Sequence, residues 1–306
     1  MQALYAYTLN NNSDILRGEN ELVRSIHKLN DLYIYQLSFL IEIFEFARHW
    51  MEEAKQKFLP TEEELNPNTR FIDNTIIQQL SGNLDFCHRT DQLKISWKEE
   101  EELVRRLYQS IRNSDLCKDY MLSPTNNYER DRAFILDLFK QHINGEEALI
   151  SYYEEKNIHW ANDYTVALYY IEKTIRALEE NAKESDPLPG IPSQSEDDDR
   201  DFAVSLYKKT IQHNEEYEKM IAQSTLNWDT ERIAMLDMLL LKMALTEFME
   251  FPSIPIKVSF NEYIEISKEY STPKSKVFIN GILDKLINEL TQENKIKKSG
   301  RGLLEQ

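Results

Sequence analysis

Apolar residues recur every three or four positions along most of the chain, which is the spacing of one face of an α-helix. The longest such stripe predicts a helix over residues 19–58, closed by Pro60 and a polar loop. It is formed by Leu22, Ile26, Leu29, Tyr33, Leu37, Leu40, Phe44 and Trp50. Further helices are predicted over 70–80 and 97–112. The pattern favours an all-α protein built as a helical bundle.

Composition agrees with this pattern. Only 7 glycines and 9 prolines occur among 306 residues, whereas doubly wound sheets and barrels need many tight turns. A hydrophobic content of 41% allows a sizeable core. The net charge of -17 argues against a broad basic surface for nucleic acid but leaves a local basic patch open.

The chain has the character of a cytoplasmic protein. Cys87 and Cys117 are too few for a disulfide framework and suit a reducing compartment. The start of the chain lacks the basic leader and apolar run of a signal peptide. The most hydrophobic stretch is interrupted by Asp237, Lys242 and Glu247, so we expect a buried helix there and no membrane span.

An internal similarity lies on either side of a predicted linker. The linker, residues 183–198, is rich in proline, serine and acidic residues. Residues 131–147 align without gaps to 199–215, and the same offset takes Trp160 to Trp228 and Leu168 to Leu236. The shared residues are Asp131, Arg132, Phe134, Leu138, Lys140, Ile143 and Glu147, which recur as Asp199, Arg200, Phe202, Leu206, Lys208, Ile211 and Glu215. We interpret this as a duplicated helical hairpin; chance likeness of two amphipathic helices is the alternative.

The last hundred residues contain local helix signals. Ser259 and Glu262 have the spacing of a capping box, and Thr272-Pro273 places proline at the first position of the next helix. Gly281 lies inside that helix, where glycine costs about 1 kcal/mol relative to alanine. We therefore expect another backbone to approach it closely.

No motif for catalysis is present. The chain has no GxGxxG or P-loop, no HExxH, no CxxC and no GxSxG. The six histidines are scattered, and none follows a glutamate at the spacing of di-iron bundles. We expect no catalytic residue, no metal site and no cofactor, and hence a protein that is not an enzyme.

Three C-terminal stretches carry a resemblance to a known family. They are "NWDTERIAMLDMLLLKMALTEF", "IPIKVSFNEYIEISKEY" and "SKVFINGILDKL", which begin at residues 227, 254 and 275. Together with Gln2-Ala3-Leu4-Tyr5 near the start, they resemble the NusB family of bacterial transcription antitermination factors, in the long form of Bacteroidetes. The resemblance implies an all-α fold with a NusB-like C-terminal region and a large helical insertion.

The resemblance also implies a domain organisation. Its parts are a first helix (1–11), a helical insertion (12–182) with the duplicated hairpin near 129–180, the linker (183–198), a NusB-like core (199–292) and a basic flexible tail (293–306).

NusB proteins pair with the ribosomal protein NusE and bind the boxA element of nascent RNA within RNA polymerase antitermination complexes. The resemblance therefore implies these partners and the same non-enzymatic role here. The implied RNA-binding residues are Gln2, Tyr5, Lys274, Lys276 and Phe278. Phe278 or Tyr5 would stack on a base while the lysines meet phosphates; the alternative is that both rings are core aromatics. Asp237 is the implied contact to NusE, and the alternative is an aspartate that reaches solvent at a helix edge.

Two features depart from the family pattern. Lys242 stands where arginine is frequent, and the arginine-rich start of the first helix is absent. No capping residue precedes the apolar positions of "MQALYAYTLN". We therefore hypothesise that Met1 is an internal methionine, that a basic segment is missing upstream, and that RNA binding is weaker than in relatives.

Two other functions remain open. The first is a protein-interaction scaffold of NusB-like fold that has lost RNA binding. The second is an accessory domain of an RNA methyltransferase, which is disfavoured because the chain lacks a glycine-rich cofactor-binding domain.

Overall fold

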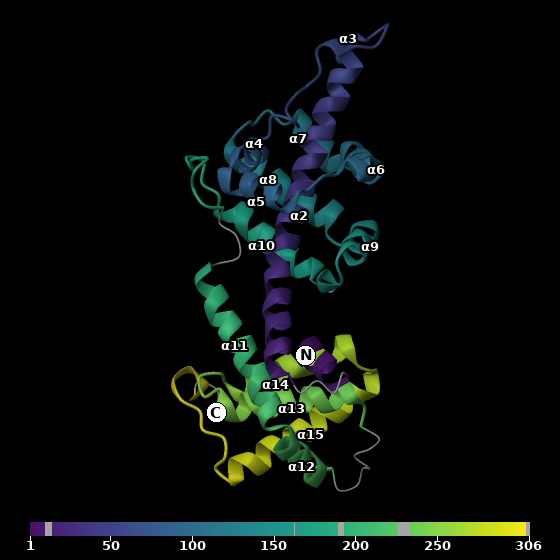
Figure 1. Cartoon of the computed structure of the whole chain (residues 1–306). Helices are drawn as coiled ribbons and strands as arrows, with labels where there is room; N and C mark the ends of the chain where they lie inside the picture. Colours follow the sequence, from purple (N-terminus) through teal and green to yellow (C-terminus); the bar gives the residue numbers. More distant parts are fainter. Residues whose placement is uncertain (10–13, 162, 189–192, 226–232, 304–306) are drawn as a thin grey trace. The chain divides into compact units, whose positions relative to one another are not determined.

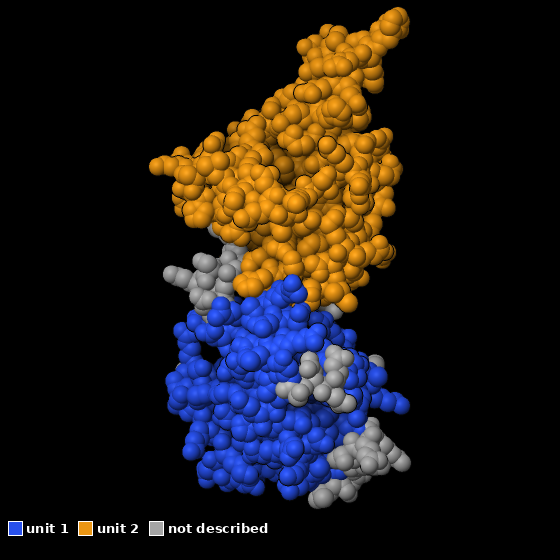
Figure 2. All heavy atoms as spheres, viewed as in Figure 1, with its two compact units in different colours: residues 1–24, 196–306 blue, residues 25–195 orange. Residues whose placement is uncertain are grey.

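The computed structural model describes residues 1–9, 14–161, 163–188, 193–225 and 233–303. Within these ranges the secondary structure is helical and contains no strand, which confirms the all-α prediction (Figure 1). The chain divides into two compact units, each with its own hydrophobic core. Unit 1 comprises residues 1–24 and 196–306, and unit 2 comprises residues 25–195 (Figure 2). None of the described helices is both long and apolar enough to cross a bilayer.

Unit 1 is assembled from segments that are far apart in the sequence. Its elements are α1 (Gln2–Leu9), the start of α2 (Ile15–Lys55), α11 (Ser193–Gln212) from residue 196, α12 (Asn214–Ser224), α13 (Met235–Glu250), α14 (Ile256–Tyr270), α15 (Pro273–Gln292) and a 3-10 turn (Gly300–Leu303). Helix α13 lies at the centre and contacts α1, α12, α14 and α15. It is buried on most of its circumference because neighbours cover several of its faces.

Unit 2 is built around the remainder of α2. Its other elements are α3 (Glu62–Leu65), α4 (Thr75–Gly82), α5 (Leu84–Leu93), a 3-10 turn (Lys98–Glu100), α6 (Glu101–Asn113), α7 (Asp115–Leu122), α8 (Tyr128–Leu138), a π-helical turn (Phe139–Ile143), α9 (Glu147–Lys156), a 3-10 turn (Ile158–Trp160) and α10 (Tyr164–Ala177). Between Leu32 and Phe44 nearly every side chain of α2 is buried. The predicted stripe therefore becomes the axis of this core.

The predicted helices occur with shifted ends. The helix expected over 19–58 is α2, and the helix expected over 70–80 begins only at Thr75. Asn74 sets that start, because its side chain accepts hydrogen bonds from the backbone N–H groups of Ile76 and Ile77. The helix expected over 97–112 begins as a 3-10 turn and continues as α6.

The expected linker is partly structured. The backbone N–H of Leu84 donates to the Glu184 carbonyl (2.9 Å), and the Asn83 amide donates to the Asp186 carbonyl (2.8 Å). Leu188 is buried against unit 2. Helix α11 begins at Ser193, inside the range expected to be a linker. Composition predicted a solvated segment. These contacts join residues about 100 positions apart, so no local pattern in the sequence indicates them.

The expected flexible tail is also held in place as far as residue 303. The Lys298 ammonium donates to the carbonyls of Glu247 (3.1 Å) and Phe251 (2.9 Å), where it caps the C-terminal end of α13. The Ser299 N–H donates to the Pro252 carbonyl (2.9 Å). A Cβ on Gly302 would lie 2.1 Å from that same oxygen, so only glycine fits there. Burial of Lys298 lowers its pKa.

The two aligned segments share an order of helices. At the offset that takes Asp131 to Asp199, residues 147–156, which form α9, fall on 215–224, within α12. Helix α10 falls likewise on residues 232–245, most of them in α13. Trp160 is buried and donates through its indole N–H to the Lys28 carbonyl (2.7 Å). Its counterpart Trp228 lies outside the described residues.

Candidate RNA and protein interface

Helix α1 packs on the core of unit 1 through one side only. Leu4 is buried, and the ring of Tyr7 meets Tyr207 of α11 edge-on with a centroid separation of 6.2 Å. This packing leaves Gln2 exposed and Tyr5 36% exposed. Tyr5 is therefore not a core aromatic in this structure, and part of the residue is accessible to solvent.

The start of α15 presents two lysines on a capped helix end. The Thr272 hydroxyl accepts a hydrogen bond from the backbone N–H of Ser275 (3.2 Å), and Pro273 follows it as expected. Ser275 is buried, whereas Lys274 and Lys276 are exposed. The ion pairs found among the described residues include neither lysine. Cations that stay unpaired can meet an anionic ligand.

Phe278 lies one turn further along α15. It is half-buried and packs against the core of unit 1. The ring therefore combines a packing role with partial access to solvent.

Asp237 lies in the first turn of α13 and is only 4% exposed. Its carboxylate accepts a hydrogen bond from the Ser271 hydroxyl (2.5 Å), so it has a partner within the chain. The alternative of an aspartate that reaches solvent is therefore wrong. Ser271 directly precedes the N-cap Thr272, so this bond attaches the start of α15 to the start of α13. Helix α1 contacts the same α13.

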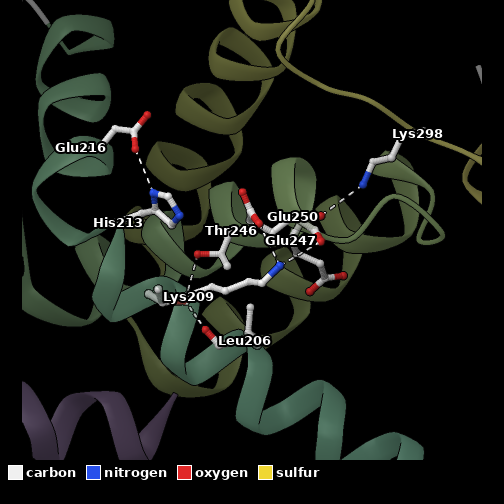
Figure 3. Close-up of polar contacts among 9 residues, drawn as sticks. Leu206, Lys209, His213, Glu216, Thr246, Glu247, Glu250 and Lys298 are labelled. Atoms are coloured by element: carbon white, nitrogen blue, oxygen red, sulfur yellow. Dashed lines mark hydrogen bonds and ion pairs between the residues drawn. The ribbon is translucent and has the colours of Figure 1, made fainter. Parts of the chain in front are cut away.

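Sequence reasoning missed a polar network at the other end of α13. The buried Glu247 carboxylate accepts hydrogen bonds from the hydroxyls of Ser259 (2.6 Å) and Tyr263 (2.9 Å) on α14. Burial raises the pKa of Tyr263 well above its usual value. Figure 3 shows Lys298 at the Glu247 carbonyl and the Lys209–Glu250 ion pair (2.8 Å) beside it. These contacts join α13 to α14, to α11 and to the C-terminal segment.

Lys242 is also buried, with its ammonium at 2.7 Å from both Asn214 and Glu218 of α12. The lysine that replaces the frequent arginine of the family therefore contacts this chain's own α12. The described residues contain no group of three histidine, cysteine, aspartate or glutamate side chains that could hold a metal ion.

Comparisons with known proteins bear on this arrangement. A family model described as "NusB family" matches residues 165–288, from the start of α10 to near the end of α15. The transcription antitermination protein NusB of Salinibacter ruber is 38% identical over 138 residues, which are 44% of this chain and 86% of that protein. The corresponding protein of Chloroherpeton thalassium is 41% identical over 106 residues, 35% of this chain and 50% of its own length. That of Koribacter versatilis is 40% identical over 102 residues, 33% of this chain and 70% of its own. No solved structure matches the chain significantly.

The helical fold and these relatives define the class of protein, that of the transcription antitermination proteins. Within this class, the chain belongs to the NusB family, since it covers most of a NusB protein at 38% identity. The family match extends further toward the N-terminus than the C-terminal motifs of the sequence indicate, because it includes α10 of unit 2.

Proposed function

We propose that this chain is a non-enzymatic transcription antitermination factor that binds boxA-type nascent RNA together with NusE. The observation that carries the proposal is the start of α15, where exposed Lys274 and Lys276 precede the half-buried Phe278. The lysines offer two cations to phosphates, and the ring offers a face to a base. The positive end of the α15 dipole adds to the attraction for an anion.

Helix α1 contributes the second part of the proposed RNA surface. The exposed Gln2 amide offers hydrogen bonds to a base edge, and the partly exposed Tyr5 offers a ring. Helix α1 contacts α13, and Asp237 attaches α13 to the start of α15. One helix thus supports both parts of the surface.

A titration of boxA RNA in the presence of NusE, at two salt concentrations, tests the RNA proposal. The variant Lys274→Ala, Lys276→Ala should bind more weakly and show a salt dependence reduced by up to about two counterions. Lys219→Ala removes an exposed lysine of α12 and should bind like the unchanged chain. If the unchanged chain binds no RNA in the presence of NusE, the proposal fails. The scaffold alternative then stands, provided that NusE still binds.

We propose that Asp237 supports NusE binding, either through its charge or through the loop that it anchors. Asp237→Asn removes the charge and keeps an oxygen for Ser271, while Ser271→Ala removes the hydrogen bond and keeps the charge. A charge-based contact predicts that only the first variant loses NusE affinity. A positioning role predicts that only Ser271→Ala loses it, because Asp237→Asn keeps the acceptor oxygen and with it the hydrogen bond. Unchanged affinity in both variants contradicts the assignment.

A further inference from the structure

Helix α1 has an inward and an outward side, and few contacts decide which residues lie on each. Leu4 is buried in the core of unit 1, and Tyr7, one turn further along, is half-buried against that core. Gln2 and Tyr5 lie on the exposed side. Because α1 is a single short helix, the place of the Tyr7 ring sets its rotation about the helix axis. That rotation in turn sets the direction of Gln2 and Tyr5.

The Tyr7 ring rests on Tyr207 of α11, which is only 2% exposed. The two rings meet edge-on at an interplanar angle of 84°, an arrangement that aromatic pairs favour. The Tyr207 hydroxyl is buried and has no hydrogen-bond partner among the residues that the structure describes. The position of this ring therefore depends on the atoms packed around it.

Gly18 of α2 meets the hydroxyl end of Tyr207. A Cβ at Gly18 would lie 1.8 Å from the Tyr207 hydroxyl oxygen and 2.8 Å from Cζ, so any side chain at this position would displace the ring. Glycine is unfavourable within a helix, and this close approach gives a physical reason for its presence near the start of α2. The adjacent Glu19 pairs with Lys208 of α11 at 2.8 Å, which holds the start of α2 against α11.

We propose that Gly18 and Tyr207 are positioning residues for the RNA surface of α1. The start of α2 fixes the Tyr207 ring, and the ring supports Tyr7. Tyr7 then directs Tyr5 and Gln2 toward the ligand. This role rests on the proposed function, in which α1 contacts RNA, and it requires no contact between RNA and either positioning residue.

Gly18→Ala tests this role in a titration of boxA RNA with NusE at two salt concentrations. The added methyl group displaces Tyr207, and RNA affinity should fall about tenfold, as expected for the loss of one stacked base. The salt dependence should not change, because Lys274 and Lys276 are intact. Gly82→Ala is the matched control and should bind like the unchanged chain, since the nearest described atom to a Cβ there is a Glu184 oxygen at 3.8 Å.

Tyr207→Phe separates positioning from a general loss of stability. It removes the oxygen nearest to the added methyl group and leaves Cζ at 2.8 Å, a contact that a small shift of the ring relieves. Alone, Tyr207→Phe should bind RNA like the unchanged chain, because the lost hydroxyl has no described partner. Combined with Gly18→Ala, it should restore most of the affinity. Hydrogen exchange of the α1 amides should rise in Gly18→Ala and fall again in the combined variant.

Tyr7→Ala decides the question should Gly18→Ala fail to fold. It removes the supported ring without a change in α2 or α11, and it should lower RNA affinity by a similar factor. Unchanged affinity in folded Gly18→Ala or in Tyr7→Ala overturns the positioning role alone, and so does a combined variant that is not restored. If the unchanged chain binds no RNA in the presence of NusE, the proposed function fails and the positioning role fails with it.

Discussion

At the scale of residues, three charged side chains inside the most apolar helix decide how unit 1 is assembled. Asp237, Lys242 and Glu247 follow one another at intervals of five residues on α13, so they point in different directions around the helix. Each finds a partner in a different place, at Ser271, on α12 and on α14 respectively. Their presence in the helix was evident from the sequence. Their partners were not, because each lies about 10 to 35 residues away in the chain.

Replacement of Glu247 tests the network between α13 and α14. Glu247→Ala leaves the buried hydroxyls of Ser259 and Tyr263 without an acceptor and should cost about 3 kcal/mol of unfolding free energy. Glu247→Gln keeps one acceptor oxygen and should cost about half as much. Chemical denaturation with both variants measures the difference. Equal stability of Glu247→Ala and the unchanged chain would show that the network contributes nothing.

Tyr153 offers a contrast to these satisfied groups. It is fully buried, and its hydroxyl has no hydrogen-bond partner among the residues that the structure describes, whereas the buried Tyr33 hydroxyl pairs with Thr174 at 2.8 Å. Tyr153→Phe should therefore raise the unfolding free energy by about 1 kcal/mol, and Tyr33→Phe should lower it by a similar amount. Opposite signs in the two variants are the expected result, and thermal denaturation measures them.

At the scale of elements, the two helix starts predicted near the C-terminus had different outcomes. Thr272-Pro273 begins α15 as expected. The capping box at Ser259 and Glu262 is wrong, because α14 begins at Ile256, directly after Pro255. Ser259 is instead buried within α14 and donates to Glu247. A Ser-x-x-Glu spacing also occurs inside helices, so the pattern alone could not decide between these positions.

Gly281 shows a second limit of local reasoning. The close backbone approach expected there is wrong for the described part of the chain, in which a Cβ at Gly281 meets no atom within 4 Å. The residue is exposed in the interior of α15. Gly281→Ala should therefore raise the unfolding free energy by about 0.5–1 kcal/mol through helix propensity. Thermal denaturation tests this, with Ser275→Ala as the contrast, because Ser275 is buried beside the N-cap. A loss of stability in Gly281→Ala would contradict the open surroundings of this position.

Helices α10 and α13, which occupy equivalent positions in the two aligned segments, lie in different environments. Leu240, Leu241 and Ala244 of α13 are fully buried. Their counterparts on α10 at the same offset are Glu172, Lys173 and Arg176, and Glu172 and Arg176 form an ion pair at 2.6 Å. Helix α10 is therefore amphipathic where α13 is apolar nearly all round. The hydrophobic pattern predicted the existence of both helices, and only the neighbours of each determine which faces are covered.

At the scale of the whole molecule, the fold class and the NusB-like region followed from the sequence, while the packing of unit 2 did not. Helical periodicity is a local property, and several family motifs lie close together in unit 1. The contacts of unit 2 join residues such as Tyr33 and Thr174, or Trp97 and Ser38, across long separations. No pattern in a single sequence specifies such pairs.

Buried tyrosines in both units predict how stability depends on pH. Burial raises the pKa of Tyr33, Tyr153, Tyr164 and Tyr263 above the usual value near 10. The folded chain thus keeps phenol protons that the unfolded chain releases above pH 10. The stability that these groups contribute is fully present below pH 10. Above pH 10 this stability is lost, by up to about 1.4 kcal/mol per pH unit for each tyrosine. Phenolate absorbance that rises together with loss of helical signal is the expected result, and Tyr153→Phe should make the loss shallower.

The discontinuity of unit 1 has a consequence for the order of events on the ribosome. Tyr7 is synthesised 200 residues before its ring partner Tyr207, and the rest of the unit follows later still. At a synthesis rate of roughly 5–20 residues per second, about 10 to 40 s pass between the synthesis of α1 and that of its packing partners. All of unit 2 is synthesised in this interval. Over that interval the apolar side of α1, with Leu4, has no native surface to cover it. Nascent-chain chaperones therefore have a longer opportunity to bind this N-terminal segment than any part of the molecule that is continuous in sequence.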